Sequence, residues 1–111
     1  MVSITARKER NEYQLDIIGH AGYNPGNDIV CSAVSILATT LAQKMQELEA
    51  IDVFSVMECE MDPGRVHIYA KVREGRIWRF DILFDTIMTG FALLNNTYPG
   101  YVFLDGWEKE D

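Results

Sequence analysis

One segment sets the order of the fold: GHAGYNPGNDIVCSAVSILATTLAQKMQEL, residues 19–48. Its first part is rich in glycine and turn residues. Its second part has apolar side chains at three- and four-residue spacing, which places them on one face of a helix. Asp28 precedes this run at the position of an N-cap. The segment therefore predicts a loop followed by a helix over residues 29–49.

Strands are expected on both sides of this helix. Two runs before the loop alternate apolar and polar residues, and the polar stretch Glu9–Glu12 can turn between them. Two more alternating runs follow the helix, and Asp62-Pro63-Gly64 between them is strong turn chemistry. Apolar positions from Phe80 to Leu94 predict a second helix. The predicted strands cover Val2–Lys8, Tyr13–Ile18 and residues 53–60, 65–72 and 101–105.

This order of elements predicts an α+β fold with two layers. Paired hairpins favour a mixed or antiparallel sheet of about five strands, with two helices packed on one face. A length of 111 residues fits a single domain over residues 1–111. The other face of the sheet would be uncovered, and residues 53–57 are apolar on both sides of their strand. We therefore expect a second copy to complete the sheet in a homodimer.

The chain is acidic, with 17 Asp and Glu against 10 Lys and Arg and a formal net charge of −7. Such a field opposes binding to the phosphate backbone of nucleic acid and attracts a basic protein or peptide. No apolar run has the length of a signal-peptide core or a membrane span. We expect a cytoplasmic protein without a direct nucleic-acid or membrane partner, in which Cys31 and Cys59 are free thiols.

Cys31 is the most reactive residue of the opening segment. With Asp28 as N-cap it lies in the first helical turn, where unpaired N–H groups and the helix dipole favour an anion such as a thiolate. The dipole supplies at most about 2 kcal/mol, whereas ionising most of an ordinary thiol at neutral pH needs about 2.7 kcal/mol. A nearby imidazolium usually supplies the remainder. His20 is the candidate closest in sequence, and the glycine-rich loop can fold back to bring it near.

These residues predict nucleophilic catalysis at a carbonyl group. Cys31 would attack the carbonyl carbon, and His20 would activate the thiol and later protonate the leaving amine. Backbone N–H groups around Cys31 and Ser32 would stabilise the oxyanion. Asp28 would cap the helix and could also orient His20.

Other interpretations of the same residues stay open. Cys31 also suits a small buried hydrophobe, and His20 a turn residue. A glycine-rich loop before a helix also suits an anion or phosphate, although this one lacks the P-loop lysine and GxGxxG spacing. His20, Asp28 and Cys31 could hold a metal, but without the usual ligand spacing.

Four further side chains have a structural interpretation. Cys59 lies within an alternating strand and is expected to pack. His67 is expected on a solvated strand face, and Trp78 and Trp107 in packing or at an interface. Ser32 and Ser35 flank the cysteine without a GxSxG motif, so a serine hydrolase is disfavoured.

Two paired motifs resemble those of the ribosomal-processing cysteine protease family: Gly19-His20-Ala21 and Gly26-Asn27-Asp28-Ile29-Val30-Cys31, with Ser32-Ala33-Val34-Ser35 after the second. The resemblance covers most of the chain, since the family shares this element order and a Tyr-Pro pair after its second helix, here Tyr98-Pro99. It implies a small homodimeric α+β endopeptidase without cofactor or metal, whose Cys/His dyad is Cys31 and His20.

The family removes a short N-terminal extension from large-subunit ribosomal protein twenty-seven, cutting after an aromatic residue and before a small one. The resemblance therefore implies the precursor of that protein as substrate. A rival from another class is a non-catalytic ribosome-assembly factor that binds the basic tail of the ribosomal protein without cutting it. The residues expected to support the dyad, as helix cap, oxyanion donors or loop, are Asp28, Ser32, Ser35, Gly19, Gly22 and Gly26.

Overall fold

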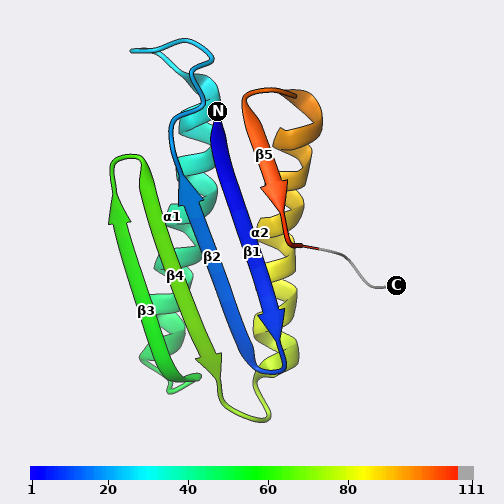
Figure 1. Cartoon of the computed structure of the whole chain (residues 1–111). Coiled ribbons are helices and arrows are strands. Elements are labelled where there is room, and N and C mark those ends of the chain that lie inside the picture. The colour runs from blue at the N-terminus through cyan, green and yellow to red at the C-terminus, as the bar shows by residue number, and fades with distance from the viewer. Residues whose placement is uncertain (108–111) are drawn as a thin grey trace.

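The computed structural model describes residues 1–107 and contains the predicted order of strands and helices, which confirms the α+β class (Figure 1). The predicted single domain of residues 1–111 includes residues 108–111, which lie outside the described residues. Within residues 1–107, neither helix combines the length and hydrophobicity needed to cross a membrane. The elements are β1 (Val2–Glu9), β2 (Glu12–Ile18), α1 (Ile29–Glu49), β3 (Phe54–Asp62), β4 (Arg65–Val72), α2 (Ile77–Thr97) and β5 (Val102–Asp105).

The strands form one mixed sheet in the order β3-β4-β2-β1-β5. Neighbouring strands are antiparallel except β1 and β5, which are parallel. Both helices cover the same face of the sheet, and no described element covers the opposite face (Figure 1). The register pairs Ile18, the last residue of β2, with Arg65, the first residue of β4. The loop that leaves β2 therefore begins beside the β3–β4 turn.

The β3–β4 turn is tighter than the sequence predicts. β3 continues to Asp62 instead of ending at residue 60, because the antiparallel ladder extends to the pair Asp62 and Arg65. Only Pro63 and Gly64 remain to connect the strands. Gly64 adopts a φ of +75°, which glycine reaches without the strain that a Cβ would cause.

The core lies between the sheet and the two helices. Tyr13 of β2 packs against Phe80 and Phe84 of α2, with ring centroids 4.9 and 5.1 Å apart. Trp107 packs on Phe84 with a centroid distance of 5.1 Å, which confirms its predicted packing role. Trp78 does not pack in the core, because it is 63 % exposed; its predicted role at an interface stays a prediction.

The start of β3 differs from its predicted two-sided apolar pattern. The register shifts between Phe54 and Val56, and this irregularity lets Val53 and Phe54 both be buried. Met57 and Cys59 also pack against the core, which confirms the packing role of Cys59. Val56 is then the one apolar residue among 53–57 left exposed in this part of the strand. Val56 is thus the apolar residue of this stretch on the open face, and the homodimer stays a prediction.

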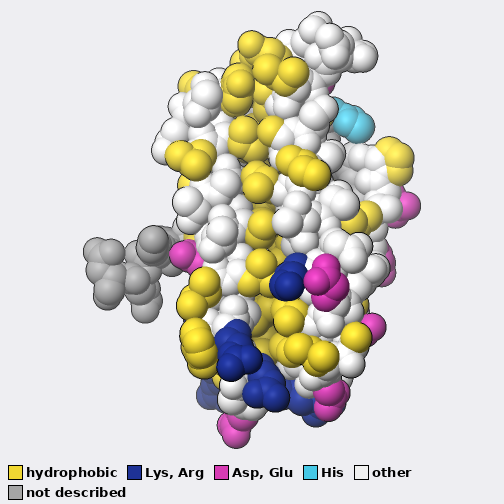
Figure 2. Space-filling view, turned by 180° about the vertical axis from the view of Figure 1, so that it is seen from behind, with side chains coloured by type: hydrophobic (Ala, Val, Ile, Leu, Met, Phe, Trp, Pro, Cys, Tyr) yellow, Lys and Arg dark blue, Asp and Glu magenta, His cyan; other side chains and the backbone are white. Residues whose placement is uncertain are grey.

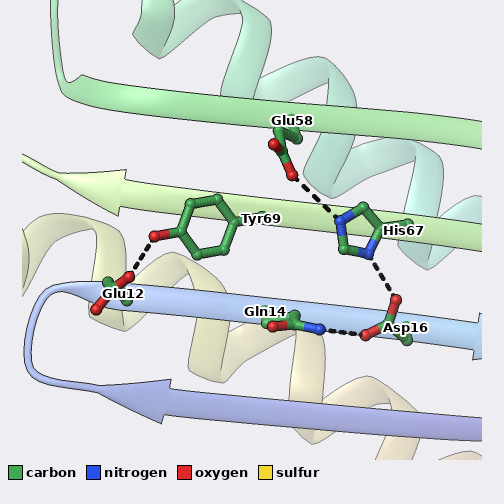
Figure 3. A network of polar contacts seen from close by, with 6 residues as sticks. All are labelled: Glu12, Gln14, Asp16, Glu58, His67 and Tyr69. Atoms are coloured by element: carbon green, nitrogen blue, oxygen red, sulfur yellow. Dashed lines mark hydrogen bonds and ion pairs between the residues drawn. The ribbon is translucent and has the colours of Figure 1, made fainter.

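The uncovered face of the sheet carries a polar network (Figure 3). His67 of β4 lies between two carboxylates: its Nδ1 is 2.6 Å from Asp16 Oδ1 and its Nε2 is 3.3 Å from Glu58 Oε1. Tyr69 donates a hydrogen bond to Glu12 beside them. The predicted position of His67 on a solvated strand face is confirmed.

The same contacts shift the pKa values of His67 and Asp16. The hydrogen bond to Asp16 is the main reason that the pKa of His67 lies above its ordinary value of 6.5, and Glu58 adds to this effect. Burial alone would raise the pKa of Asp16, but hydrogen bonds from His67 and Gln14 outweigh it and lower that pKa. The charged pair is therefore favoured at mildly acidic to neutral pH.

Replacing His67 by glutamine is expected to destabilise the protein more at about pH 5.5 than at about pH 8.5, with a difference of about 1 kcal/mol. A raised pKa in the folded state stabilises the protein below the unfolded pKa, and this contribution is lost as pH rises through the folded pKa. The lowered pKa of Asp16 stabilises the folded state at pH values above the unfolded pKa of this carboxyl group. At pH 5.5 the stabilising contributions of His67 and Asp16 are therefore both present. Urea unfolding at both pH values measures this, and equal destabilisation would contradict the charged pair.

Candidate active site

Asp28 organises the junction between the loop and α1. Its backbone has the extended conformation of an N-cap, with φ −96° and ψ 102°. Oδ1 accepts the N–H groups of Val30 and Cys31, both at 3.0 Å, and Oδ2 accepts those of Tyr23 at 2.8 Å and Asn24 at 3.2 Å. Burial would raise the pKa of Asp28, but these four backbone hydrogen bonds lower it. The carboxylate thus fixes the helix start and the loop at once.

Cys31 lies in the first turn of α1, as predicted, and is half-buried. Its Sγ accepts a hydrogen bond from the backbone N–H of Ala21 at 3.2 Å. Ala21 follows His20 in the loop and is itself only 2 % exposed, so this donor is held in a fixed place. The N–H group and the positive end of the helix dipole both complement negative charge at the sulfur.

The backbone donors predicted for the oxyanion are already occupied. The N–H of Cys31 donates to Asp28 Oδ1, and the N–H of Ser32 donates to the Asp28 carbonyl oxygen at 3.0 Å. The hydroxyl of Ser32 donates to the same carbonyl at 3.1 Å. In this structure the cap and the first helical hydrogen bond use these two N–H groups, and the oxyanion role of the backbone around Cys31 and Ser32 stays a prediction.

His20 lies at the other end of the loop and is exposed. Among residues 1–107 it has no hydrogen bond to Cys31 or to Asp28, whose carboxylate is occupied by backbone groups. Its ring lies against the backbone of Gly64 in the β3–β4 turn. Asp28 thus has the predicted capping role, whereas no hydrogen bond from the His20 ring to the Asp28 carboxylate is present within residues 1–107.

His20 and Cys31 line one cavity of about 310 Å³. The β2–α1 junction forms one wall, and the β3–β4 hairpin from Met61 to Val66 forms another. Ser35 and Gly19 of the predicted supporting set also line it. The cavity therefore brings together a thiol, an imidazole and apolar walls at the surface of the molecule.

The two other predicted glycines are loop residues that do not line the described cavity. Gly22 and Gly26 have φ values of +70° and +89°. Both therefore lie in the left-handed region that favours glycine, which supports their predicted role in shaping the loop.

Three tyrosines hold the loop from outside the cavity, a feature that the sequence analysis missed. Tyr23 of the loop packs edge-on against Tyr98 and Tyr101, with ring centroids 5.3 and 5.2 Å apart. Tyr98 and Tyr101 belong to the connection between α2 and β5. The Tyr-Pro pair after the second helix was the available signal, but its contact with the loop depends on the tertiary fold.

No group of three or more His, Cys, Asp or Glu side chains within residues 1–107 is arranged to hold a metal ion. The set of His20, Asp28 and Cys31 considered in the sequence analysis is thus not such a group. The chemistry that this geometry offers lies in the thiol and the imidazole that share the cavity.

A thiol in the first turn of a helix, beside a cavity that an imidazole also lines, suits the nucleophile and base of a cysteine protease. The family model described as cysteine protease Prp matches residues 1–103. The chain belongs to this family. The match includes the loop, α1 and the β3–β4 turn, and thus every segment that lines the cavity.

Solved structures share the Prp fold. One is Prp from S. aureus, described as an essential ribosomal processing protease, in complex with a covalently linked product peptide. Its sequence is 15% identical to this chain, and the structures match with a TM-score of 0.71 over 96% of this chain and 100% of that one. The same protein with a substrate peptide is 14% identical, with a TM-score of 0.69 over 96% and 100%. SMU.848 from Streptococcus mutans is 22% identical, with a TM-score of 0.66 over 98% and 96%. No curated protein gives a significant match.

Substitution of Asp28 tests whether one carboxylate holds both the helix and the loop. Asp28→Ala is expected to lower the urea midpoint of unfolding more than Asp28→Asn, because asparagine keeps an oxygen that can cap α1. Both variants should speed amide hydrogen exchange at Tyr23 and Asn24, whose N–H groups bond to Oδ2. Wild-type exchange at these two amides in both variants would contradict this role.

Proposed function

We propose that this member of the Prp family is a cytoplasmic endopeptidase that removes the N-terminal extension of large-subunit ribosomal protein twenty-seven, cutting after an aromatic residue. The observation that carries the proposal is the position of Cys31: its Sγ accepts the Ala21 N–H and lies in the cavity that His20 also lines. The S. aureus relative is described with a covalently linked product peptide, which is consistent with a covalent step at such a thiol.

The reaction proceeds in two steps. His20 takes the proton of the Cys31 thiol, and the sulfur attacks the carbonyl carbon of the scissile peptide bond. The C–N bond then breaks, and the leaving amine, which is the N-terminus of the mature protein, receives the proton from His20. The extension before the cut remains bound to Cys31 as a thioester. Water, deprotonated by His20, then attacks the thioester carbonyl. The C–S bond breaks, the extension leaves as a carboxylic acid, and the Cys31 sulfur takes the proton from His20. Hydrogen bonds of catalytic groups tighten when substrate binds, so the two side chains need only share the cavity beforehand.

The cavity suits one large side chain next to the cut. Its volume of about 310 Å³ is at the lower end of ligand pockets, which favours a single aromatic residue over a whole small molecule. Met61, Val66 and Ala38 supply apolar walls. The net charge of −7 attracts a basic ribosomal protein from a distance.

We also propose a homodimer, formed through the helical layer and not through the sheet. Ile29 and Ile36 of α1 and Leu93 of α2 are each more than half exposed; these three residues are called the outer helical patch. Leu37 of α1 lies against Gly90 of α2 where the helices pack, and Ile36 and Leu93 are near these two residues in the sequence. Figure 2, seen from the helical side, shows hydrophobic side chains gathered along this face. Burial of such a patch favours association.

Incubating the purified chain with a tagged precursor of the ribosomal protein tests the proposed activity. Wild type should release one product, cut after an aromatic residue, at enzyme concentrations far below that of the substrate. Cys31→Ala and His20→Ala should each lower kcat/KM at least about 1000-fold, since the two residues act as one unit. Product masses and initial rates measure this, and Cys59→Ala is the matched control that should keep activity.

Two results would contradict the protease. Unchanged cleavage by Cys31→Ala would exclude this thiol as the nucleophile. A stable, uncleaved complex of wild type with the precursor would favour the non-catalytic assembly factor that binds the basic tail. Turnover at low enzyme concentration excludes that rival.

Leu93→Glu is expected to convert the dimer to a monomer, because it would bury a charge in the outer helical patch of both copies. Sedimentation velocity measures the mass against the 12.7 kDa of one chain. Phe103→Glu on β5 changes a hydrophobic residue that is half-exposed and lies away from the patch, and it should leave the dimer intact. A monomeric wild type, or dissociation by the control alone, would contradict the helical interface.

A further inference from the structure

We infer that the β3–β4 turn positions the ring of His20, and that Gly64 is the residue on which this positioning depends. The inference rests on the proposed function, in which His20 transfers the protons. It adds a positioning residue from a distant part of the chain to the two catalytic side chains.

The first observation is the space between the turn and the imidazole. A Cβ at position 64 would lie 2.8 Å from His20 Nε2 and 3.2 Å from Cε1. The first distance is shorter than real Cβ contacts, so the ring occupies the volume that any other side chain would need. The absence of a side chain at Gly64 is therefore what allows the ring to lie there.

The second observation is a hydrogen bond that joins the same two segments. The backbone N–H of Gly19, the residue before His20, donates to the carbonyl oxygen of Gly64 at 2.9 Å. The two β-ladders of β4 reach the turn, because Arg65 pairs with Ile18 of β2 and with Asp62 of β3. The turn is thus fixed to the sheet and to the backbone that carries the imidazole.

His20 depends on this surface because little else holds its ring. Within residues 1–107 the imidazole makes no hydrogen bond and is exposed. A ring held only by packing moves when the packing surface changes. A Cβ at position 64 would displace the imidazole, which can rotate away at little cost to the fold, and the distance to Cys31 would change. Displacement of a reacting group by about 1 Å can lower a rate about 100-fold.

Gly75 provides the matched control. It has a φ of +86°, close to the +75° of Gly64, so alanine meets similar backbone strain at both positions. No atom lies within 4 Å of a Cβ at position 75, and the residue does not line the cavity. Gly64→Ala and Gly75→Ala therefore share the backbone effect and differ in the contact with His20.

The experiment compares kcat, KM, thermal unfolding and the His20 ring resonances of both variants with wild type. We expect similar decreases in Tm, but a kcat about 10- to 100-fold lower for Gly64→Ala alone, with KM little changed. The Cε1–H resonance of His20 should shift in Gly64→Ala and not in Gly75→Ala. Equal kcat values with an unshifted resonance would overturn the inference.

A measurement without substitution keeps the inference testable if Gly64→Ala does not fold. Nuclear Overhauser contacts between the His20 ring and the Gly64 Hα protons are expected in wild type, and their absence would overturn the inference. Lack of cleavage by wild type would instead contradict the proposed function. In that case the ring contact could still be present, so the two failures are distinguishable.

Discussion

Four backbone N–H groups meet at the carboxylate of Asp28, two from the first turn of α1 and two from the loop before it. These bonds satisfy donors that a helix start leaves unpaired, and they fold the loop around the same point. The loop then carries Ala21 to the sulfur of Cys31. Position and electrostatic surroundings of the thiol both follow from one capping residue.

The sheet supplies the rest of the site. Pairing of β2 with β4 places the end of β2 beside the β3–β4 turn, so the loop, α1 and the hairpin enclose one cavity. The open sheet face carries a polar network, and the helical face carries exposed hydrophobic residues (Figures 2 and 3).

Local patterns predicted most of the fold, because alternation and helical spacing are each contained within one element. Asp28 and Cys31 could be placed for the same reason, since a cap and a first turn are local. The position of Gly64 against His20 could not be predicted, because it depends on strand register between distant segments. The acceptors of the backbone donors were missed for a local reason: an N-cap carboxylate accepts the N–H of Cys31, and the Asp28 carbonyl oxygen accepts that of Ser32.

The central claim, that the loop and α1 make Cys31 the reactive thiol, is tested most directly by alkylation with iodoacetamide at neutral pH. Peptide mass spectrometry separates the rates of the two cysteines. Cys59 packs against the core, where burial raises its pKa, whereas Cys31 opens to the cavity beside the Ala21 N–H. We predict that Cys31 reacts at least about 10-fold faster than Cys59. Equal rates, or faster reaction of Cys59, would contradict the account.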